Sequence, residues 1–470
     1  MVSKEIIILS LEIVYFITAL VIVFMMISEN RNPLKTMSWT LLLLLTPFFG
    51  IIIYYFFGQD ARRLRRISKK RYKLIKKKTF EPLDLQNKET MRLEYLPLVK
   101  LLNKNNDSAL LQGSEVQCFN SGKEKFGSLI RDMENAQHHI HLQYYIFEND
   151  EVGNEIKNIL IKKASEGIEV RVLYDDAANW KTKNKFYDEM QQNGIEVTAY
   201  LQVRFPILTS RVNYRNHRKI VVIDGKTGYI GGMNIADRYV SDHWKDLHFR
   251  IAGRGVAGLQ SAFLIDWFSS GKQINGWDEY FPDSPILTNN IMQIVTDGPT
   301  EKWRTLLQAT LHILSNAKKY VYIQTPYFLP TEALLQVLQT TALSGVDVRL
   351  MVPVRLDVLF VNSAAHSYFA DIMKSGVKIY EYQPRFLHSK LIVVDDFISV
   401  VGSANMDFRS FEHNFEVNAY CYDESIASKL KHIFIDDMKD SKQIILKEWM
   451  KRPRIKKFQE SVMRMFSPLL

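Results

Sequence analysis

Cysteine is scarce in this 470-residue chain, which contains only Cys118 and Cys421. Two such residues do not make a disulfide framework, and as free thiols they fit a reducing compartment. Neither lies in a metal-ligand spacing, and nothing else in the sequence indicates a metal or a cofactor, so we expect none. With 12% aromatic and 24% charged residues, the chain is not of the disordered class, and a globular body is expected.

The chain has a net charge of +10, but most of it lacks an excess of basic residues. Residues 62–78 hold 11 Lys and Arg and no acid, and residues 442–470 hold 8 bases and 2 acids. The rest of the chain therefore has 42 bases and 49 acids. An acidic body argues against a broad nucleic-acid groove, and we expect no nucleic-acid partner. The two basic segments predict local attraction to an anionic surface, such as a membrane.

Two long apolar runs lie near the N-terminus, at residues 6–27 and 37–57. Each is long enough to cross a hydrocarbon core of about 30 Å. The short link between them contains Pro33, so residues 1–60 are expected to form a hairpin of two transmembrane helices. Pro47 and Gly50 are tolerated in such a helix, with a kink. A cleaved signal peptide is the alternative for the first run, but the run is too long for one.

The basic residues that follow the second run set the expected topology. The link between the runs holds only Arg31 and Lys35, whereas residues 61–112 begin with the cluster of 11 bases. The positive-inside rule then places the N-terminus and the rest of the chain in the cytoplasm of a multi-pass cell-membrane protein. We interpret residues 61–112 as a basic juxtamembrane segment and linker.

The remaining chain alternates strand and helix patterns and repeats itself at a spacing of 171–181 residues. Matching segments are NAQHHIHLQ (135–143) with NAKKYVYIQ (316–324), and GIEVRVL (167–173) with GVDVRLM (345–351). This period is too long for a solenoid. It predicts two duplicated α/β domains, residues 113–290 and 291–440. Residues 441–470 form a basic amphipathic tail, either a helix packed on the body or one lying at a membrane interface.

The pattern His-x-Lys-x-x-x-x-Asp occurs once in each half. The two copies are His217, Lys219 and Asp224, and His388, Lys390 and Asp395. An Asn follows each His by 17 residues, at Asn234 and Asn405, among small residues that let backbone approach a phosphate. One histidine could attack phosphorus while the other protonates the leaving group. The lysines and asparagines could hold the phosphoryl oxygens. One copy alone would be weak evidence, but two with matching spacing are strong.

Strand geometry explains why the His and the Lys of a motif act together. Side chains two residues apart point to the same face of a strand, and the apolar run after each Lys predicts a strand buried on both faces. If the two halves pack about a pseudo-two-fold axis, one His lies on each side of the phosphorus. The triplet His138, His139 and His141 is a weaker metal candidate, because strand alternation separates its side chains.

These features resemble the phospholipase D superfamily and, within it, the bacterial cardiolipin synthases. The resemblance covers nearly the whole chain, including the apolar runs, both motifs and the terminal SPLL. The specific segments are QYYIF (143–147), NYRNHRKIVVIDG (213–225), IGGMNIADRY (230–239), TPYFLP (325–330) and VGSANMDFRSFEHNFE (401–416). Two departures are Asp396 in place of a Gly and AANW after Asp176 in place of a Gly-Ser pair. The second concerns the acceptor-lipid pocket.

The resemblance implies a ping-pong reaction through a phosphohistidine, with His217 as the nucleophile and His388 as the acid and base. The symmetry of the motifs does not decide between the two histidines. Asp246 lies 29 residues after His217 and Glu416 lies 28 after His388, so each could support an imidazole, with a surface salt bridge as the alternative. The motif aspartates complete the candidate catalytic set, but we expect them to point away from phosphate and to be structural.

The expected function is phosphatidyl transfer between two phosphatidylglycerol molecules, which gives cardiolipin and glycerol. Phosphatidylglycerol and anionic membrane lipids are the expected partners, and the oligomeric state stays open. Other enzymes of the superfamily are the first alternative: a phospholipase D hydrolase, a phosphatidylserine synthase or a membrane-tethered nuclease. A nuclease should have a basic body, which this chain lacks. A non-enzymatic membrane scaffold is the second alternative, but it should have lost a motif His or Lys, and none is lost.

Overall fold

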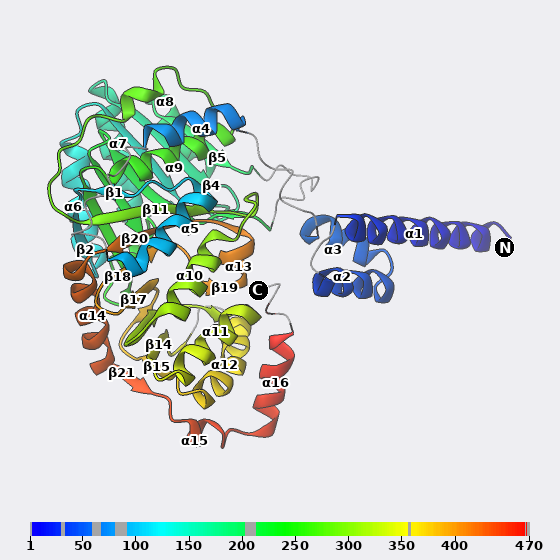
Figure 1. Ribbon diagram of the computed structural model, residues 1–470. Helices are drawn as coiled ribbons and strands as arrows, with labels where there is room; N and C mark the ends of the chain where they lie inside the picture. The colour runs from blue at the N-terminus through cyan, green and yellow to red at the C-terminus, as the bar shows by residue number, and fades with distance from the viewer. Residues whose placement is uncertain are drawn as a thin grey trace. The chain divides into compact units, whose positions relative to one another are not determined.

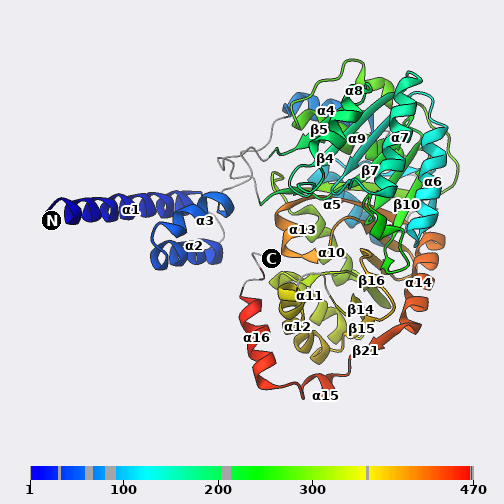
Figure 2. The same cartoon turned by 180° about the vertical axis from the view of Figure 1, so that it is seen from behind.

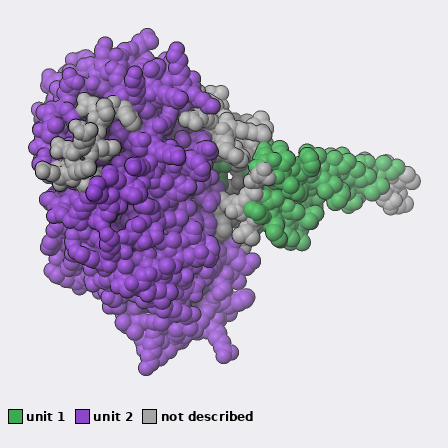
Figure 3. Space-filling view, in the orientation of Figure 1, with its two compact units in different colours: residues 1–64, 203–214 green, residues 65–202, 215–470 purple. Residues whose placement is uncertain are grey.

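The computed structural model describes residues 2–29, 33–58, 67–79, 92–202, 213–355, 359–465 and 467. The chain divides into two compact units, residues 1–64 with 203–214 and residues 65–202 with 215–470 (Figure 3). The first unit holds the N-terminal helices, and the second holds the α/β body. The motifs of both halves lie within the second unit.

The described part of the N-terminal unit contains three helices, α1 (Val2–Ser28), α2 (Pro33–Leu45) and α3 (Phe49–Phe57). Within α1, Ile6–Ser28 is the one described helix long and apolar enough to cross a membrane. The second apolar run is divided into α2 and α3 around Pro47, which cannot continue the hydrogen-bond ladder of a helix. Phe48, which precedes α3, has a positive φ of 62°, so the break is a turn where the sequence predicted only a kink.

Part of the basic juxtamembrane segment is a helix, α4 (Lys69–Lys78), that begins after the capping hydroxyl of Ser68. It packs on α9 (Val256–Ser269) of the body. Ile75 is buried there, and Lys76 is buried beside it, where loss of solvent lowers the pKa of the lysine to about 8. The other lysines of α4 are exposed. Residues 61–66 and 80–91 of this segment lie outside the described residues.

The body is built on two mixed sheets with the same strand order (Figures 1 and 2). The first sheet runs, in order, β2 (Glu115–Phe119), β10 (His248–Ala252), β8 (Thr227–Gly231), β7 (Lys219–Ile223), β3 (His139–Tyr144), β4 (Glu169–Asp175) and β5 (Glu196–Tyr200). The second repeats it with β11 (Ile291–Asp297), β20 (Asn414–Tyr422), β18 (Ile398–Gly402), β17 (Leu391–Val394), β12 (Tyr320–Gln324), β14 (Asp347–Pro353) and β15 (Lys378–Tyr382). The mixed α/β fold is therefore duplicated, as the sequence predicted.

Short elements extend the second sheet at both edges. Beside β11 lies β1 (Leu111–Gln112), which follows α5 (Leu96–Asn106), so a helix and a strand occur in the stretch interpreted as linker. At the opposite edge, β21 (Ser441–Gln443) pairs with β15. The chain continues through α15 (Leu446–Trp449) to α16 (Arg454–Arg464), which packs against α12 (Leu359–Lys374).

Three hydrophobic clusters account for the layering of the body. One lies under α6 (Gly122–Glu134), α7 (Glu151–Ser165) and α8 (Asn184–Gln192) on the first sheet. Another lies under α10 (Thr305–Asn316), α11 (Glu332–Leu343) and α12 on the second sheet. The third lies between the sheets and joins Val222 and Phe249 of the first half to Val393 and Val417 of the second. Strands β7 and β17 face one cluster on each side, which explains their continuous apolar sequences.

The two halves also exchange backbone hydrogen bonds. Strand β6 (Arg215–Asn216) of the first half pairs in parallel with the start of β20, and β16 (Phe386–Leu387) of the second half pairs in parallel with β9 (Trp244–Lys245). The exchange is reciprocal and continues into the motifs, because His217 N donates to Phe415 O at 2.9 Å and His388 N donates to Lys245 O at 2.7 Å. Each motif histidine is thus attached to the backbone of the opposite half.

A buried arginine adjacent to His217 reinforces this junction. Arg218 donates to Asp266 at 2.6 Å within the first half, and to the backbone oxygens of Glu416 and Asp297 of the second half at 3.0 and 3.1 Å. The Arg218 and Asp266 side chains are 5% and 3% exposed, so both charges are shielded from water and depend on each other.

Replacing Arg218 by Ala should destabilise the body by about 3–5 kcal/mol, because the Asp266 carboxylate would remain buried without a cation. Chemical denaturation followed by circular dichroism measures this loss. The matched control is Arg238→Ala, which removes an exposed pair with Glu148 and should cost about 0–1 kcal/mol. Equal losses in both variants would contradict the structural importance of the Arg218 contacts.

Candidate active site

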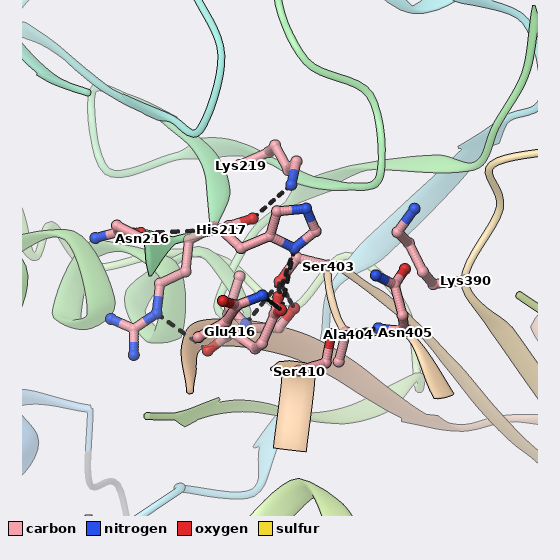
Figure 4. Close-up of polar contacts among 12 residues, drawn as sticks. Asn216, His217, Lys219, Lys390, Ser403, Ala404, Asn405, Ser410 and Glu416 are labelled. Atoms are coloured by element: carbon pink, nitrogen blue, oxygen red, sulfur yellow. Dashed lines mark hydrogen bonds and ion pairs between the residues drawn. The ribbon is translucent and has the colours of Figure 1, made fainter. Parts of the chain in front are cut away.

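The two motifs meet at the junction of the halves. His217 lies between β6 and β7, and His388 lies between β16 and β17. His217 is 8% exposed and His388 is 6% exposed. After burial and the two motif lysines, the positive charge that His217 can carry also lowers the pKa of His388. Figure 4 shows Lys219 of the first half above the His217 ring and Lys390 of the second half to the right of it. The structure therefore gathers both His-Lys pairs into one buried polar centre.

The carboxylate that contacts each motif histidine comes from the opposite half. The Nδ1 atom of His217 donates to both oxygens of Glu416 at 3.0 Å, and Nδ1 of His388 donates to Asp246 Oδ2 at 2.6 Å. Each carboxylate thus contacts the histidine of the other half, although its sequence spacing was counted from the histidine of its own half. A carboxylate on Nδ1 leaves Nε2 as the candidate reacting nitrogen of each ring, and Nε2 of His388 lies 3.2 Å from Nζ of Lys390.

The two carboxylates occupy different electrostatic environments. Burial raises the pKa of Asp246 to about 7. Burial acts on Glu416 in the same direction, but His217, Lys219 and the hydroxyl of Ser403 together hold the pKa of Glu416 below its usual value. The carboxylate behind His217 is therefore held in its ionised form more strongly than the carboxylate behind His388. Such a separation of two carboxylates is typical of sites with distinct acid and base roles.

One aligned pair of residues accounts for part of this difference. Ser403 occupies the place in GSAN that Gly232 occupies in GGMN. The Ser403 hydroxyl donates to Glu416 Oε2, whereas at Gly232 a Cβ atom would lie only 2.1 Å from Oδ1 of Asp246. Glycine is required there for space, so Asp246 receives no hydroxyl from this position. The two halves therefore differ at the aligned position that lies against each carboxylate, Ser403 in the second half and Gly232 in the first.

Burial also controls the histidines and a motif lysine. Loss of solvent lowers the pKa of His217 to about 4, against the attraction of Glu416. Burial and the neighbouring Lys390 also lower the pKa of His388. The pKa of Lys219 falls well below its usual value for the same reason, burial beside a second lysine. A phosphate anion bound between these groups would favour their protonated forms, because opposite charge within a few ångströms stabilises a cation.

The lysines and asparagines are held in place by local contacts. The Nζ atoms of Lys219 and Lys390 donate to the backbone oxygens of His217 and His388, respectively. Asn405 lies with Lys390 near His217, and its amide donates to Asp407 at 3.2 Å (Figure 4).

Asn234 has a partly different setting. Its Oδ1 accepts from Ile146 N at 3.1 Å and its amide donates to Tyr239 at 2.5 Å. The amide oxygen and the amide nitrogen of Asn234 therefore each have a hydrogen-bond partner within the protein.

The motif aspartates follow the C-terminal ends of β7 and β17, and their carboxylates accept hydrogen bonds from backbone amides. Asp224 accepts from the backbone nitrogens of residues 137, 138 and 139 at 2.8–3.0 Å. Asp395 accepts from those of residues 318, 319 and 320 at 2.7–2.9 Å. Both aspartates have a positive φ, 55° and 51°, which Asp tolerates better than most residues. The structure therefore places these two carboxylates in equivalent turns, in contact with backbone amides.

Aromatic side chains border the histidines and were not found from the sequence. The ring of Tyr145 lies 4.8 Å from that of His217, and the ring of Trp244 lies 5.2 Å from that of His388. Tyr145 belongs to the QYYIF segment, and Trp244 is two residues before Asp246, so proximity to recognised segments was the available signal. The histidines His139 and His141 instead contact Gln260 at 3.1 and 3.3 Å. In the described ranges no cluster of His, Cys, Asp and Glu has the form of a metal site.

The paired His-Lys motifs and the duplicated sheets define a phospholipase D-like protein. A family model described as cardiolipin synthase, PLD-like domain, matches residues 129–267 and 310–438, and a phospholipase D-nuclease N-terminal model matches residues 13–59. The cardiolipin synthase of Listeria monocytogenes is 40% identical over 94% of this chain and 95% of its own length. The major cardiolipin synthase ClsA of Bacillus subtilis is 37% identical over 98% of both chains. This chain belongs to the cardiolipin synthase family.

A solved structure supports the fold independently. The crystal structure of phosphatidylserine synthase from Haemophilus influenzae aligns with a TM-score of 0.61 and covers 80% of this chain and all of that one. The two sequences are only 15% identical, so the likeness concerns the fold.

Replacing Asp224 by Ala should lower stability by about 2–5 kcal/mol, because three backbone donors lose their acceptor and an unfavourable φ remains. Thermal unfolding measures the effect, and Asp224→Asn should be milder because Asn tolerates this backbone conformation. Activity per folded molecule, measured well below the unfolding temperature, should stay within a few-fold of the parent. An Asp224→Ala protein of normal stability that has lost its activity would assign the carboxylate to the chemistry.

Replacing Ser403 by Ala should shift the acidic limb of the pH–activity profile to higher pH. Loss of the hydroxyl donor raises the pKa of Glu416, so this carboxylate becomes protonated, and its support of His217 is lost, at a higher pH than in the parent. The control is Ser399→Ala, a buried serine of β18 that does not contact Glu416. An unshifted acidic limb in Ser403→Ala would show that the hydroxyl does not set the charge of Glu416.

Proposed function

We propose that this protein is a phosphatidyltransferase that moves a phosphatidyl group from one phosphatidylglycerol molecule to another, giving cardiolipin and glycerol. The observation that carries the proposal is the crossed pair of histidine–carboxylate contacts, one from each half, in one buried centre with both motif lysines. Two imidazoles with separate supports suit a displacement that needs a nucleophile and an acid at once. Membership of the cardiolipin synthase family supports the choice of substrate.

The first step forms a covalent intermediate. Nε2 of His217 attacks the phosphorus of the donor lipid, and the bond from phosphorus to the glycerol headgroup oxygen breaks. The departing oxygen takes a proton from Nε2 of His388, and glycerol leaves. The ionised Glu416 behind His217 stabilises the positive charge that the imidazole gains as a phosphohistidine.

The second step reverses the proton movement. Nε2 of His388 takes the proton from a hydroxyl of the acceptor phosphatidylglycerol, whose oxygen attacks phosphorus as the bond to His217 breaks. The raised pKa of Asp246 supports this role, because the pair of His388 and Asp246 can hold a proton near neutral pH and return it. Lys219 and Lys390 by their charge, and Asn405 by hydrogen bonding, would stabilise the negative charge that develops on the phosphoryl oxygens.

We infer a pseudo-two-fold axis between the motifs, which would put the two histidines on opposite sides of one phosphorus. The identical strand orders and the reciprocal pairing of β6 with β20 and β16 with β9 support this arrangement. Residues of one half then contact the corresponding residues of the other, as in an isologous dimer interface. We extend the proposal to Asn234, which would approach the phosphate from the first half as Asn405 does from the second.

We further propose that the chain is anchored as a multi-pass protein of the bacterial cell membrane, with both catalytic halves in the cytoplasm. The apolar helix Ile6–Ser28 and the exposed lysines of α4 support this topology. Residues 37–57 would form the second, interrupted span as α2 and α3. This anchoring keeps the site near the anionic lipids that are its proposed substrates.

Mass spectrometry of the products tests the function directly. The purified full-length protein, incubated with phosphatidylglycerol vesicles, should release glycerol and form cardiolipin. Phosphatidic acid as the main product would instead identify a hydrolase. His217→Ala and His388→Ala should each lower the rate by about 10²–10⁴-fold or more, because each removes a separate catalytic group. The control Arg238→Ala should keep most of the activity.

A trapped adduct tests the assignment of roles. His388→Asn removes the group that activates the acceptor, so a slow first turnover should leave phosphatidyl-histidine at His217. Peptide mapping locates the adduct. An adduct on His388 in otherwise active protein would reverse the two roles while leaving the overall reaction unchanged.

A further inference from the structure

The C-terminal helix α16 is attached to the body through its polar side. Glu460 is buried and accepts from Arg452 at 2.9 Å, and Arg464 donates to Asp371 of α12 at 2.8 Å. Arg452 also stacks on Trp449, whose ring lies 5.5 Å from that of Phe369 of α12. Figures 1 and 2 both show α16 lying beside α12 at the edge of the body. These contacts fix which side of α16 faces outward.

The outward side of α16 is apolar. Ile455, Phe458 and Met465 are 65%, 66% and 77% exposed. Their spacing of three and seven residues places them on one face of the helix, with the half-buried Val462 between them. A helix on a water-facing surface normally turns its apolar stripe inward, but α16 buries a glutamate and exposes the stripe. An exposed apolar stripe of this kind is typical of a contact surface.

The charge around the stripe is strongly positive. The bases of residues 446–465 are Lys447, Lys451, Arg452, Arg454, Lys456, Lys457 and Arg464, and the acids are Glu448 and Glu460. Glu460 pairs with Arg452, Glu448 with Lys451, and Asp371 with Arg464. The net positive charge of the outer surface therefore comes from Lys447, Arg454, Lys456 and Lys457. Exposed Ile445 and Met450, which flank α15, extend the apolar character beyond α16.

We propose that the outer face of residues 445–465 is a second membrane-contact site, which lies flat on an anionic bilayer with Ile455, Phe458 and Met465 inserted among the lipids. Apolar side chains bordered by Lys and Arg are the pattern of helices that lie in the plane of a membrane interface. A second copy of this chain is disfavoured as the occupant, because two equally basic faces would repel each other. The proposal does not depend on the catalytic roles of the two histidines.

This contact would hold the second half of the body at the lipid surface. The N-terminal helices anchor only one end of the chain, whereas α16 packs on α12 of the second sheet. The α16 face would therefore limit rotation of the body away from the bilayer. Both ends of the enzyme would then be held at the surface from which it takes lipid substrates.

A fluorescent label at position 458 tests the contact in the full-length protein. The variant Phe458→Cys, made together with Cys118→Ser, leaves Cys421, which is fully buried, as the other cysteine. An environment-sensitive dye is attached and the protein is placed in nanodiscs of phosphatidylglycerol and phosphatidylcholine. We expect blue-shifted emission and quenching by brominated lipids. A dye at Lys456→Cys, on a different side of the helix, should show a smaller shift and less quenching.

Water-like emission at position 458 in these nanodiscs would overturn the proposal. A blue shift without quenching by brominated lipid, accompanied by cross-linking between copies, would assign the face to self-association and would overturn it equally. In nanodiscs of phosphatidylcholine alone, quenching should be weaker, because the bases lose their anionic partners. Equal quenching in both lipid compositions would contradict the electrostatic part of the proposal.

Hydrogen exchange of the otherwise unmodified chain gives a second measurement. Amides of residues 454–464 should exchange more slowly in phosphatidylglycerol-containing nanodiscs than in phosphatidylcholine alone. The double variant Ile455→Ser and Phe458→Ser should lose this difference, while the control Gln459→Ser keeps it. Because the replaced side chains are exposed, thermal unfolding should be unchanged. Protection that persists in the double variant would exclude the apolar stripe as the contact.

Discussion

The structure depends on two buried imidazole–carboxylate contacts that cross from one half of the chain to the other. Isolated, the first half would contain His217 without Glu416, and the second would contain His388 without Asp246. A carboxylate buried without its partner is costly, so the same contacts that prepare the histidines also favour association of the halves. Association of the two halves and positioning of the two histidines therefore depend on the same contacts. The parallel pairing of β6 with β20, and of β16 with β9, fixes the backbone from which these side chains extend.

Duplication alone would give two equivalent histidines, yet a two-step transfer needs unequal ones. The inequality comes from small differences between aligned positions. Ser403 donates to Glu416, whereas Gly232 only leaves space for Asp246, and the pKa values of the two carboxylates move in opposite directions. A single hydroxyl in a water-poor site has a large effect, because hydrogen bonds to an anion are strong there. The duplication therefore supplies the framework, and local substitutions make the surroundings of the two histidines unequal.

The sequence was sufficient for the features that its internal repeat and its local patterns encode. The α/β duplication followed from the repeat, and the strand after each motif lysine followed from its apolar run. Which carboxylate serves which histidine could not be predicted, because the choice depends on how two separate sheets pack. The break of the second apolar run at Pro47 was underestimated for a related reason. A proline shows where a helix loses a hydrogen bond, but contacts among neighbouring helices decide between a kink and a turn.

The tail shows why a periodic pattern does not by itself determine which face is buried. The apolar stripe of α16 would conventionally be assigned to the core, but Glu460 occupies the inward side and is neutralised by Arg452. The contact of Arg464 with Asp371 adds a second polar attachment. A helix held by polar contacts leaves its apolar side chains on the outside, where the proposed membrane contact would cover them. Burying an ion pair is tolerable when it is well paired, and in that proposal the bilayer covers the apolar surface that the protein core does not.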